Sequence, residues 1–367
     1  MGSFAALFSD LPDPRAANAW HDLSEIMFIA FAAVLCGAES CQDMADFGIA
    51  KEGALRRVLC LRHGVPSHDT FSRVFRVLDP EAFEATFRRF TAAFAEQIGA
   101  AGPSADRLVA IDGKSLAGAF EAGARASPLH LVTAWASESR LVLAQRRAPG
   151  RSETRGALEL VDLLDLVDTV VTADALHGNR KMAAAIRARG GHYVLALKGN
   201  RGPLFHAAVA LLANAPPQAG GEPERAHGRC EQRRAAVVTV PADWAQRFGF
   251  AGLAAVARIE TVRAHRGQEK RQSRYFVLSR PQPAARVLEI VRAHWGIENR
   301  QHWILDVVFD EDRARARKDN AGQNLALLRR LALNLLRADP YKAAIRRKIK
   351  RAGWQEDYLF ALLAQMR

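Results

Sequence analysis

The chain has 367 residues and carries 52 Lys and Arg against 39 Asp and Glu, which gives a formal net charge of +13 at neutral pH. Hydrophobic residues make up 49% and charged residues 25%, so disordered, collagen-like and low-complexity proteins are excluded. A high net charge is evidence about binding partners and not about the fold, and the obvious polyanionic partners are nucleic acids. On charge alone, a basic protein without a nucleic-acid role remains the alternative.

Signals for membrane insertion or secretion are not visible in the sequence. The longest apolar stretch, residues 26–38, is shorter than the roughly 20 residues of a membrane-spanning helix, and the N-terminus lacks a basic segment. The four cysteines form no C-x-x-C pair, so the sequence predicts neither a disulfide framework nor a zinc ribbon. We expect no membrane partner and a reducing, cytoplasmic location, associated with the nucleoid if the partner is DNA.

The first hundred residues are predicted to form a helical N-terminal domain, because apolar residues recur at helical spacing over residues 20–99. Within it, Ser67 can cap a short amphipathic helix that runs to Val77 and carries Arg73 and Arg76. Such a helix could enter a DNA groove, and short basic helices also serve as ordinary solvated faces. The Ala-Gly-Pro-Ser stretch at 101–104 predicts the end of this domain.

The central region has the apolar pattern of strands that form a meander and then alternate with helices, which predicts a mixed sheet covered by helices. The expected strands are 108–111, 129–136, 141–145, 169–173 and 193–197, and the expected helices are 157–166 and 180–189. A Pro/Gly-rich stretch then precedes further β-like runs, and helices return after them. The predicted domains are 1–104 (N-terminal helical, DNA-binding), 105–227 (first part of the sheet domain), 228–281 (β-rich insertion) and 282–367 (second part, with a basic tail).

Two aspartates follow apolar runs that predict buried strands. Asp112 comes after residues 108–111, and Asp174 comes after residues 169–173, so each should lie at the carboxyl end of a strand. Ligand sites in open α/β sheets lie at these ends. Two neighbouring carboxylates repel each other unless a cation lies between them. The alternative is a pair of unrelated aspartates that cap turns.

A third acid, Glu298, lies on a predicted helix over residues 288–309. At 100° per residue it falls within an apolar stripe, where a carboxylate needs an arginine or a metal. The other members of the stripe are Val291, Trp295, His302, Leu305 and Phe309. His294 and His302 flank Glu298 at i−4 and i+4, as in a helical zinc site, but the H-E-x-x-H spacing of zinc proteases is absent. The all-oxygen set of Asp112, Asp174 and Glu298 favours Mg²⁺ or Mn²⁺.

Several cations are candidates for phosphate contacts. Lys114 and Lys198 should point to the same sheet edge, either as phosphate contacts or as structural lysines. Residues 313–351 hold 13 Lys and Arg against two Asp, which suggests a phosphate track. In its leucine-rich part, Arg329, Arg330 and Arg337 are expected to point outward. The run that contains Arg346, Arg347, Lys348, Lys350 and Arg351 has no apolar stripe, so it is expected to follow DNA or to be a solvated tail.

Long motifs in the chain resemble the DDE transposases of bacterial insertion sequences, and within them the H-repeat-associated group. The resemblance covers nearly the whole chain. Its most specific part is H-W-G-I-E-N at 294–299, followed by H-W at 302–303, L-D-V at 305–307, Phe309 and E-D at 311–312. The other motifs are W-H-D-L at 20–23 through F-G at 47–48, A-I-D-G-K at 110–114, V-T-A-D-A-L-H at 171–177 and Y-V-L-A-L-K-G-N at 193–200.

The resemblance implies an α/β, ribonuclease-H-like mixed sheet flanked by helices, with a β-rich insertion before the helix that carries the glutamate. It implies a catalytic triad of Asp112, Asp174 and Glu298 that binds two Mg²⁺ (or Mn²⁺) ions. The implied activity is cleavage of double-stranded DNA at element ends and strand transfer into a target, with at least a dimer in the paired-end complex. His177, His294 and His302 join the expected DNA contacts. A metal-dependent nuclease without strand transfer and a DNA-binding regulator remain the alternatives.

Two departures from the family pattern are visible. Related transposases with such an insertion carry a tyrosine and an arginine before the glutamate and a lysine after it, where this chain has Val291, His294 and Leu305. The segment 151–155 also departs from the Ser-Asn-Glu-Ile that usually precedes the following helix. The phosphate-binding role of these positions is therefore unassigned.

Overall fold

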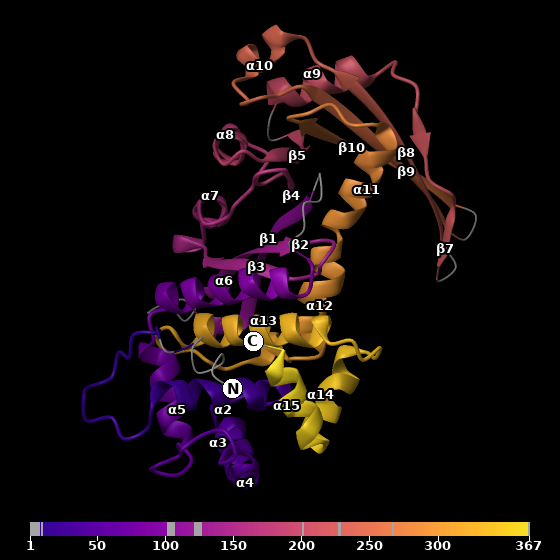
Figure 1. Ribbon diagram of the computed structural model, residues 1–367. Helices are drawn as coiled ribbons and strands as arrows, with labels where there is room; N and C mark the ends of the chain where they lie inside the picture. The colour runs from indigo at the N-terminus through magenta and orange to yellow at the C-terminus, as the bar shows by residue number, and fades with distance from the viewer. Residues whose placement is uncertain are drawn as a thin grey trace.

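The computed structural model describes residue 8 and residues 10–100, 107–120, 127–199, 202–226, 229–265 and 268–365. The predicted boundary at 101–104 lies outside these residues. Figure 1 shows the N-terminal helices and the C-terminal helices side by side below a long, curved sheet. The N-terminal helices are α2 (Leu23–Leu35), α3 (Cys41–Ala50), α4 (Glu52–Leu55), α5 (His68–Val77) and α6 (Pro80–Gln97). The predicted cap of α5 is confirmed, because the Ser67 side chain accepts a hydrogen bond from the Thr70 amide.

The sheet begins with five strands in the order β3-β2-β1-β4-β5. Strands β1, β4 and β5 are parallel, and β2 is antiparallel to both β1 and β3. Their bounds are β1 Arg107–Phe120, β2 Pro128–Ala136, β3 Val142–Arg147, β4 Thr169–Ala173 and β5 His192–Leu197. Helices α7 (Glu153–Asp162) and α8 (Arg180–Ala188) lie in the crossover connections, as parallel strands require. This mixed sheet flanked by helices confirms the expected ribonuclease-H-like fold class.

The predicted β-rich segment is β-structured and continues the same sheet. Strand β10 (Gln268–Leu278) pairs antiparallel with β5, and β9 (Ala255–His265) and β8 (Arg229–Thr239) follow it. Short strands β6 (Ala219–Gly220) and β7 (Glu224–Ala226) pair with β8. Helices α9 (Gly202–Leu212) and α10 (Ala242–Phe248) accompany these strands. The strands thus form one sheet with the central strands rather than a separate barrel or sandwich.

The two faces of the sheet are buried by different helices. Alternate residues of β1 point to opposite faces, so Val109 and Ile111 pack with α7 and α8, while Leu108 packs in a cluster with α11 (Ala284–His294). The chain then passes through a π-helical turn, η3 (Ile297–His302), and α12 (Trp303–Val307). Helix α11 and this turn therefore carry the chain along the sheet towards the C-terminal helices (Figure 1).

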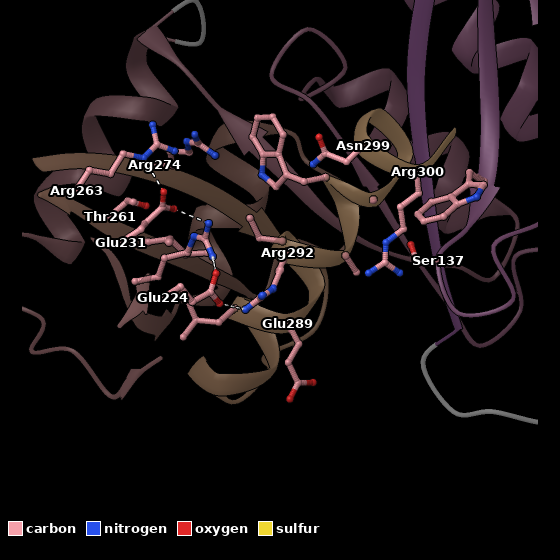
Figure 2. Close-up of a pocket in the computed structure, with 18 residues that line it drawn as sticks. Ser137, Glu224, Glu231, Thr261, Arg263, Arg274, Glu289, Arg292, Asn299 and Arg300 are labelled. Carbon is pink, nitrogen blue, oxygen red and sulfur yellow. Dashed lines mark hydrogen bonds and ion pairs between the residues drawn. The ribbon is translucent and has the colours of Figure 1, made fainter. Parts of the chain in front are cut away.

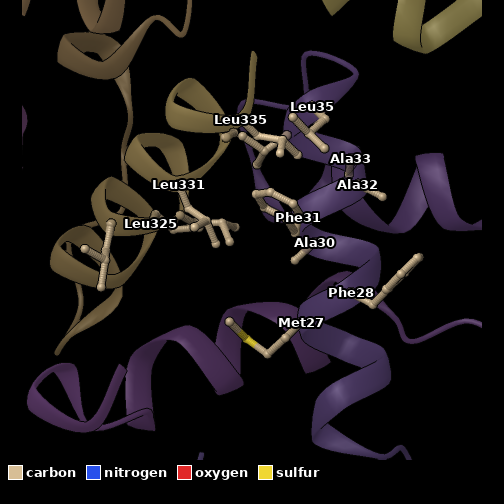
Figure 3. Close-up of a cluster of buried hydrophobic side chains, with 14 of the residues drawn as sticks. Met27, Phe28, Ala30, Phe31, Ala32, Ala33, Leu35, Leu325, Leu331 and Leu335 are labelled. Carbon is tan, nitrogen blue, oxygen red and sulfur yellow. The ribbon is translucent and has the colours of Figure 1, made fainter. Parts of the chain in front are cut away.

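The N-terminal and C-terminal helices share one hydrophobic core. Met27 and Phe31 of α2 pack in a single cluster with Leu331 and Leu335 of α13 (Ala321–Ala338), as Figure 3 shows. Helices α14 (Ile345–Trp354) and α15 (Glu356–Ala364) contribute to the same cluster. Among the described residues, none of the helices combines the length and apolarity needed to cross a membrane.

The outward arginines predicted for α13 are wrong. Arg329 and Arg330 are buried, with Arg330 Nη1 2.7 Å from Glu311 Oε1 and Arg329 donating to the Glu39 carbonyl. Arg337 donates to the carbonyls of Arg140 and Arg300. The reason is that α13 packs against α2, α5 and α6 and also against β2 and β3, so few positions on it face water.

The predicted stripe-free basic tail is also wrong, because it forms the amphipathic helix α14. Its inner face buries Lys348, Ile349 and Ala352. Lys348 Nζ donates to the carbonyls of Leu336 and Asp339, both at 2.8 Å, at the end of α13. A lysine that satisfies the last carbonyls of a helix in this way is a structural cap. The predicted DNA contact of Lys348 is therefore contradicted, whereas Arg346, Arg347 and Lys350 are exposed.

Candidate active site

The two aspartates lie side by side on neighbouring parallel strands. Ile111 of β1 is paired with Ala173 of β4, so Asp112 and Asp174 each follow the last pair of this ladder. Strand β1 itself continues to Phe120, because its pairing with β2 extends through Asp112. The expectation that Asp112 ends its strand is thus wrong, although the parallel pairing does end there. Two neighbouring central strands therefore hold both carboxylates at the end of their parallel pairing.

Glu298 lies in η3, where π-helical hydrogen bonding replaces the α-helical pattern. The wider turn shifts the register, so Ile297 and Gln301 occupy the core and Glu298 is exposed. The prediction that Glu298 lies within the apolar stripe is therefore wrong, since that prediction assumed a regular 100° step per residue. The shift turns the carboxylate away from the core, and π-turns of this kind often occur at functional sites.

Electrostatic effects show that the acids are close together. Burial, followed by the charge of Glu298 and smaller contributions from Glu153 and Asp174, raises the pKa of Asp112 to about 7 against the opposing effect of the Gly113 backbone hydrogen bond. Burial also raises the pKa of Glu298, with Asp174 adding to the effect and Arg274 opposing it. The three carboxylates thus gather negative charge at this site, which a bound cation would balance. Their oxygen donors suit Mg²⁺ or Mn²⁺, so the residues present fit a divalent ion.

Two histidines next to these acids are neutral. Burial, reinforced by Arg330 and Lys114, lowers the pKa of His302 to about 3, although its Nδ1 lies 3.6 Å from Asp112 Oδ2. Burial lowers the pKa of His294 to about 4, and its Nδ1 is 3.1 Å from Thr172 Oγ1. Neither imidazole can therefore offer a positive charge to a phosphate near neutral pH. Their DNA contacts stay predictions, in which a neutral imidazole would form a hydrogen bond rather than an ion pair.

The two histidines that flank Glu298 in the sequence do not form a helical zinc site with it, in line with the preference for an all-oxygen site. Within the described ranges, the group of His, Cys, Asp and Glu that could hold a metal consists of Glu153, Asp174 and His177, whose ligand atoms lie within 4.8 Å of one another. His294 instead contacts β4, and His302 faces Asp112. His177 is fully buried, with Nε2 2.8 Å from Glu153 Oε1, so its predicted DNA contact is contradicted. Sequence reasoning assigned no role to Glu153, although it lies in the segment 151–155 that was compared with the family's Ser-Asn-Glu-Ile.

Lys114 is a structural cation rather than a phosphate contact. Its side chain is buried, and Nζ lies 2.5 Å from Asp306 Oδ1 and 2.9 Å from Asp312 Oδ1. These partners occupy α12 and the short turn η4 (Glu311–Arg313), so the predicted DNA contact of Lys114 is contradicted. Lys198, by contrast, is exposed just after β5.

Comparison with known proteins adds the family. The family described as "Transposase DDE domain" matches residues 103–335, and the one described as "DDE_Tnp_1-associated" matches residues 5–91. The chain belongs to the DDE transposase family.

Two relatives match this chain over nearly their full length. It is 32% identical to "Putative transposase YncI" of Escherichia coli O157:H7, over 97% of this chain and 93% of that protein. It is 31% identical to "H repeat-associated putative transposase YhhI" of E. coli (strain K12), over 97% and 96%. Among solved structures, a piggyBac transposase synaptic complex with hairpin DNA aligns with a TM-score of 0.46 at 12% identity, over 100% of this chain and 77% of that chain.

This DDE transposase has a basic cavity beside Glu298 that sequence reasoning did not identify. The cavity measures about 630 Å³ and lies between β8–β10 and the α11–η3 segment. Figure 2 shows Arg263 and Arg274 reaching it from the strands and Arg292 and Arg300 from the helices. The Arg274 guanidinium stacks 4.8 Å from the ring centroid of Trp295, which is 38% exposed. The only sequence signal was an excess of arginines in strands, which a surface sheet also shows.

Proposed function

We propose that this chain catalyses metal-dependent cleavage of DNA at the ends of an insertion sequence and joins the freed 3′ ends to target DNA. In the joining step the 3′-hydroxyl attacks a target phosphodiester and displaces the target's own 3′-oxygen, which leaves as a hydroxyl. The observation that carries the proposal is the pairing of β1 with β4, which places Asp112 and Asp174 side by side, with Glu298 close enough to raise the pKa of Asp112. Membership of the DDE transposase family supports it. Pairing of two DNA ends would require at least a dimer.

In this proposal Asp112, Asp174 and Glu298 hold the divalent ions, and two ions are expected. When bound, such ions activate the attacking hydroxyl and stabilise the leaving oxygen of a phosphodiester. The strands β1 and β4 fix the two aspartates, and η3 carries the glutamate. The neutral His302 lies against Asp112 without competing as a cation. The protein's contribution is therefore mainly positioning and charge.

The basic cavity offers a path for DNA next to the acids. Guanidinium groups bind phosphates, and an exposed indole can stack on an unpaired base. Arg300 lies in the same turn as Glu298, and the Arg274–Trp295 pair lies just before that turn in the cavity wall. Arg263 and Arg292 are ion-paired with Glu231 and Glu224, so they would have to exchange partners to contact DNA. Arg73 on α5 is exposed and remains the favoured reader of the end sequence, whereas Arg76 is paired with Asp319 at 2.7 Å.

The test is a cleavage and joining assay on the full-length chain, with duplex DNA that carries the inverted repeats flanking the gene. With Mg²⁺, the wild type should nick the ends and join them to a plasmid. Asp112→Asn, Asp174→Asn and Glu298→Gln should each lower the rate by about 10³-fold or more, because each removes an ion ligand. Asp243→Asn, an exposed acid on α10, is the matched control and should retain activity.

Other results would point to a different function. Cleavage without any joined product would identify a nuclease of the same fold. Specific binding without cleavage in Mg²⁺ or Mn²⁺ would identify a DNA-binding regulator. Activity near the wild-type rate in Glu298→Gln would remove that residue from the proposed set of ligands.

A further inference from the structure

Glu153 forms a hydrogen-bonded group with two histidines directly beside the acidic site. It is the first residue of α7, and its carboxylate is 2.8 Å from Nε2 of both His130 and His177. The two histidines come from different parts of the fold, since His130 is in β2 and His177 is in the loop after β4. On the other side of His130, Nδ1 is 2.8 Å from Ser115 Oγ of β1. One carboxylate therefore connects four segments.

The carboxylate is ionised, and both histidines donate to it. Burial alone would raise the pKa of Glu153, but the hydrogen bonds from His130 and His177 outweigh burial and lower the pKa to about 2. An ionised carboxylate can only accept hydrogen bonds, so Nε2 of each histidine carries the proton. Its place at the start of α7 adds a favourable interaction with the helix dipole. The Glu153 carboxylate is therefore the common hydrogen-bond acceptor of His130 and His177.

Gly113, the residue after Asp112, makes room for this group. A Cβ atom at Gly113 would lie 2.4 Å from Glu153 Cδ and 2.6 Å from His130 Nε2. Real Cβ atoms do not approach other heavy atoms this closely, and here both neighbours are held by hydrogen bonds. The absence of a side chain at Gly113 therefore lets the carboxylate pack against the backbone of β1 next to Asp112.

His177, the second histidine bound to Glu153, is part of the turn that orients Asp174. His177 is fully buried, and its backbone amide donates to the Asp174 carbonyl at 3.1 Å. The Leu176 amide donates to Asp174 Oδ1 at 2.9 Å, so the turn orients the aspartate itself. Gly178 is packed against the Ala196 carbonyl of β5, where a Cβ would lie at 2.2 Å. Moving the His177 ring would therefore move the Asp174 turn.

We propose that Glu153 is a positioning residue of the acidic site, which clamps His130 and His177 and thereby sets the spacing of Asp112 and Asp174 for a divalent ion. This inference rests on the proposed function, in which the two aspartates hold the ion. Groups that orient ion ligands in this way typically change metal affinity by about 10- to 100-fold when they are removed. Glu153 acts through its histidine partners, so its negative charge without those hydrogen bonds is not sufficient for full affinity for the divalent ion.

The experiment measures Mn²⁺ binding to the full-length, metal-free chain by calorimetry, independently of any DNA reaction. Glu153→Gln should weaken Mn²⁺ binding by about 10- to 100-fold in the dissociation constant. His130→Leu, which keeps the Glu153 charge but removes a donor, should weaken it to a similar extent. The double variant should be little worse than either single variant, because both break the same clamp. Glu159→Gln, on the same helix and paired with Arg155, is the control and should bind as the wild type does.

A rescue variant and a stability measurement complete the design. His130→Gln retains an N–H near the Nε2 position and should keep most of the affinity. Thermal unfolding in EDTA identifies variants that bind weakly because they are unfolded, and His130→Leu provides the test if Glu153→Gln does not fold. Weakened binding in Glu153→Gln together with wild-type binding in His130→Leu would overturn the proposal, because Glu153 would then act as a ligand or as a charge.

Unchanged binding in both variants, or no Mn²⁺ binding by the wild type, would also overturn it. Failure of the proposed function is distinguishable from these results. In that case the wild type would bind Mn²⁺ with the predicted dependence on the clamp but would neither cleave nor join end-bearing DNA.

Discussion

Lys114 shows how a single buried cation can hold a functional segment in place. It lies two residues after Asp112 on β1, and its two carboxylate partners, Asp306 and Asp312, follow Glu298 in the chain. The close backbone approach at Gly118, where a Cβ would lie 2.4 Å from the Ala314 carbonyl oxygen, reinforces the same contact. The ion pairs thus connect the strand of the first aspartate to the segment of the glutamate.

We expect Lys114→Met to lower the free energy of unfolding by about 1–3 kcal/mol, because two partly buried carboxylates lose their cation. Chemical denaturation of the full-length chain measures the change. Arg313→Met is the control, since this arginine is largely exposed and lies 3.8 Å from Asp310. It should change stability by no more than about 0.5 kcal/mol. Equal stability of both variants would show that Lys114 holds nothing in place.

The role of Lys114 could not be predicted from the sequence, whereas the positions of Asp112 and Asp174 could. Each aspartate follows an apolar run of its own, so local pattern and the geometry of parallel strands are sufficient to pair them. Both partners of Lys114 lie far from it in the chain, with Asp312 separated from it by 198 positions. Glu153 is a similar case, because its histidines come from two other segments. Side-chain partners of this kind are set by tertiary packing alone.

At the scale of elements, periodicity predicted helices well but not their departures from regularity. Strand β4 was predicted with its observed bounds, and α8 to within one residue. The π-turn at η3 was not predictable, because periodicity analysis applies one fixed angle per residue and η3 departs from it. The buried face of α14 was not predicted, because it includes Lys348, and hydrophobicity patterns count a lysine as polar even when its side chain is buried.

Helix α14 allows a direct comparison of a structural and an exposed lysine. Lys348 is 4% exposed and bonds two carbonyls at the end of α13, with Asp339 Oδ2 also 3.3 Å away. We expect Lys348→Met to cost about 3–5 kcal/mol, because Asp339 remains buried without its cation. Lys350→Met, two residues away and exposed, should cost no more than about 0.5 kcal/mol. Thermal unfolding of the two variants checks this difference, and equal melting temperatures would contradict the cap.

At the scale of the whole molecule, the shared core makes the N-terminal helices depend on the C-terminal ones. Leu331 of α13 is buried in the cluster that contains Phe31 of α2 and Phe75 of α5. Asn324 of α13 also donates to the carbonyls of Phe75 and Leu78. The two ends of the chain therefore form one packed unit across the sequence, which no local pattern could predict.

We expect Leu331→Ala to cost about 2–5 kcal/mol and to raise amide hydrogen exchange in α2 and α5 as well as in α13. The reason is that all three helices lose packing against the same cavity. Strands β8 and β9 contribute to other clusters and should exchange as before. Val167→Ala, an exposed position, is the control. Exchange that rises in α13 alone would mean that the N-terminal helices are stable by themselves.

Much of the excess positive charge of the C-terminal helices lies inside the protein rather than on its surface. Arg329, Arg330 and Lys348 are buried, and Arg351 stacks on the rings of Tyr341 and Tyr358. Of the basic run on α14, Arg346, Arg347 and Lys350 are the exposed members. In the proposed function, these three are therefore the cations on α14 that contact DNA phosphates.

Replacing Arg346, Arg347 and Lys350 together with glutamine should weaken binding to end-bearing and random duplexes alike. The slope of log K against log salt should fall by up to ~0.9 for each phosphate that the variant no longer neutralises, because fewer counterions are released. The matched control, Arg346→Lys/Arg347→Lys/Lys350→Arg, keeps all three charges and should keep the slope. Fluorescence anisotropy titrations at several salt concentrations measure both variants. A slope unchanged by the glutamine variant would show that the outer face of α14 is solvated and that DNA follows the arginines beside Glu298 instead.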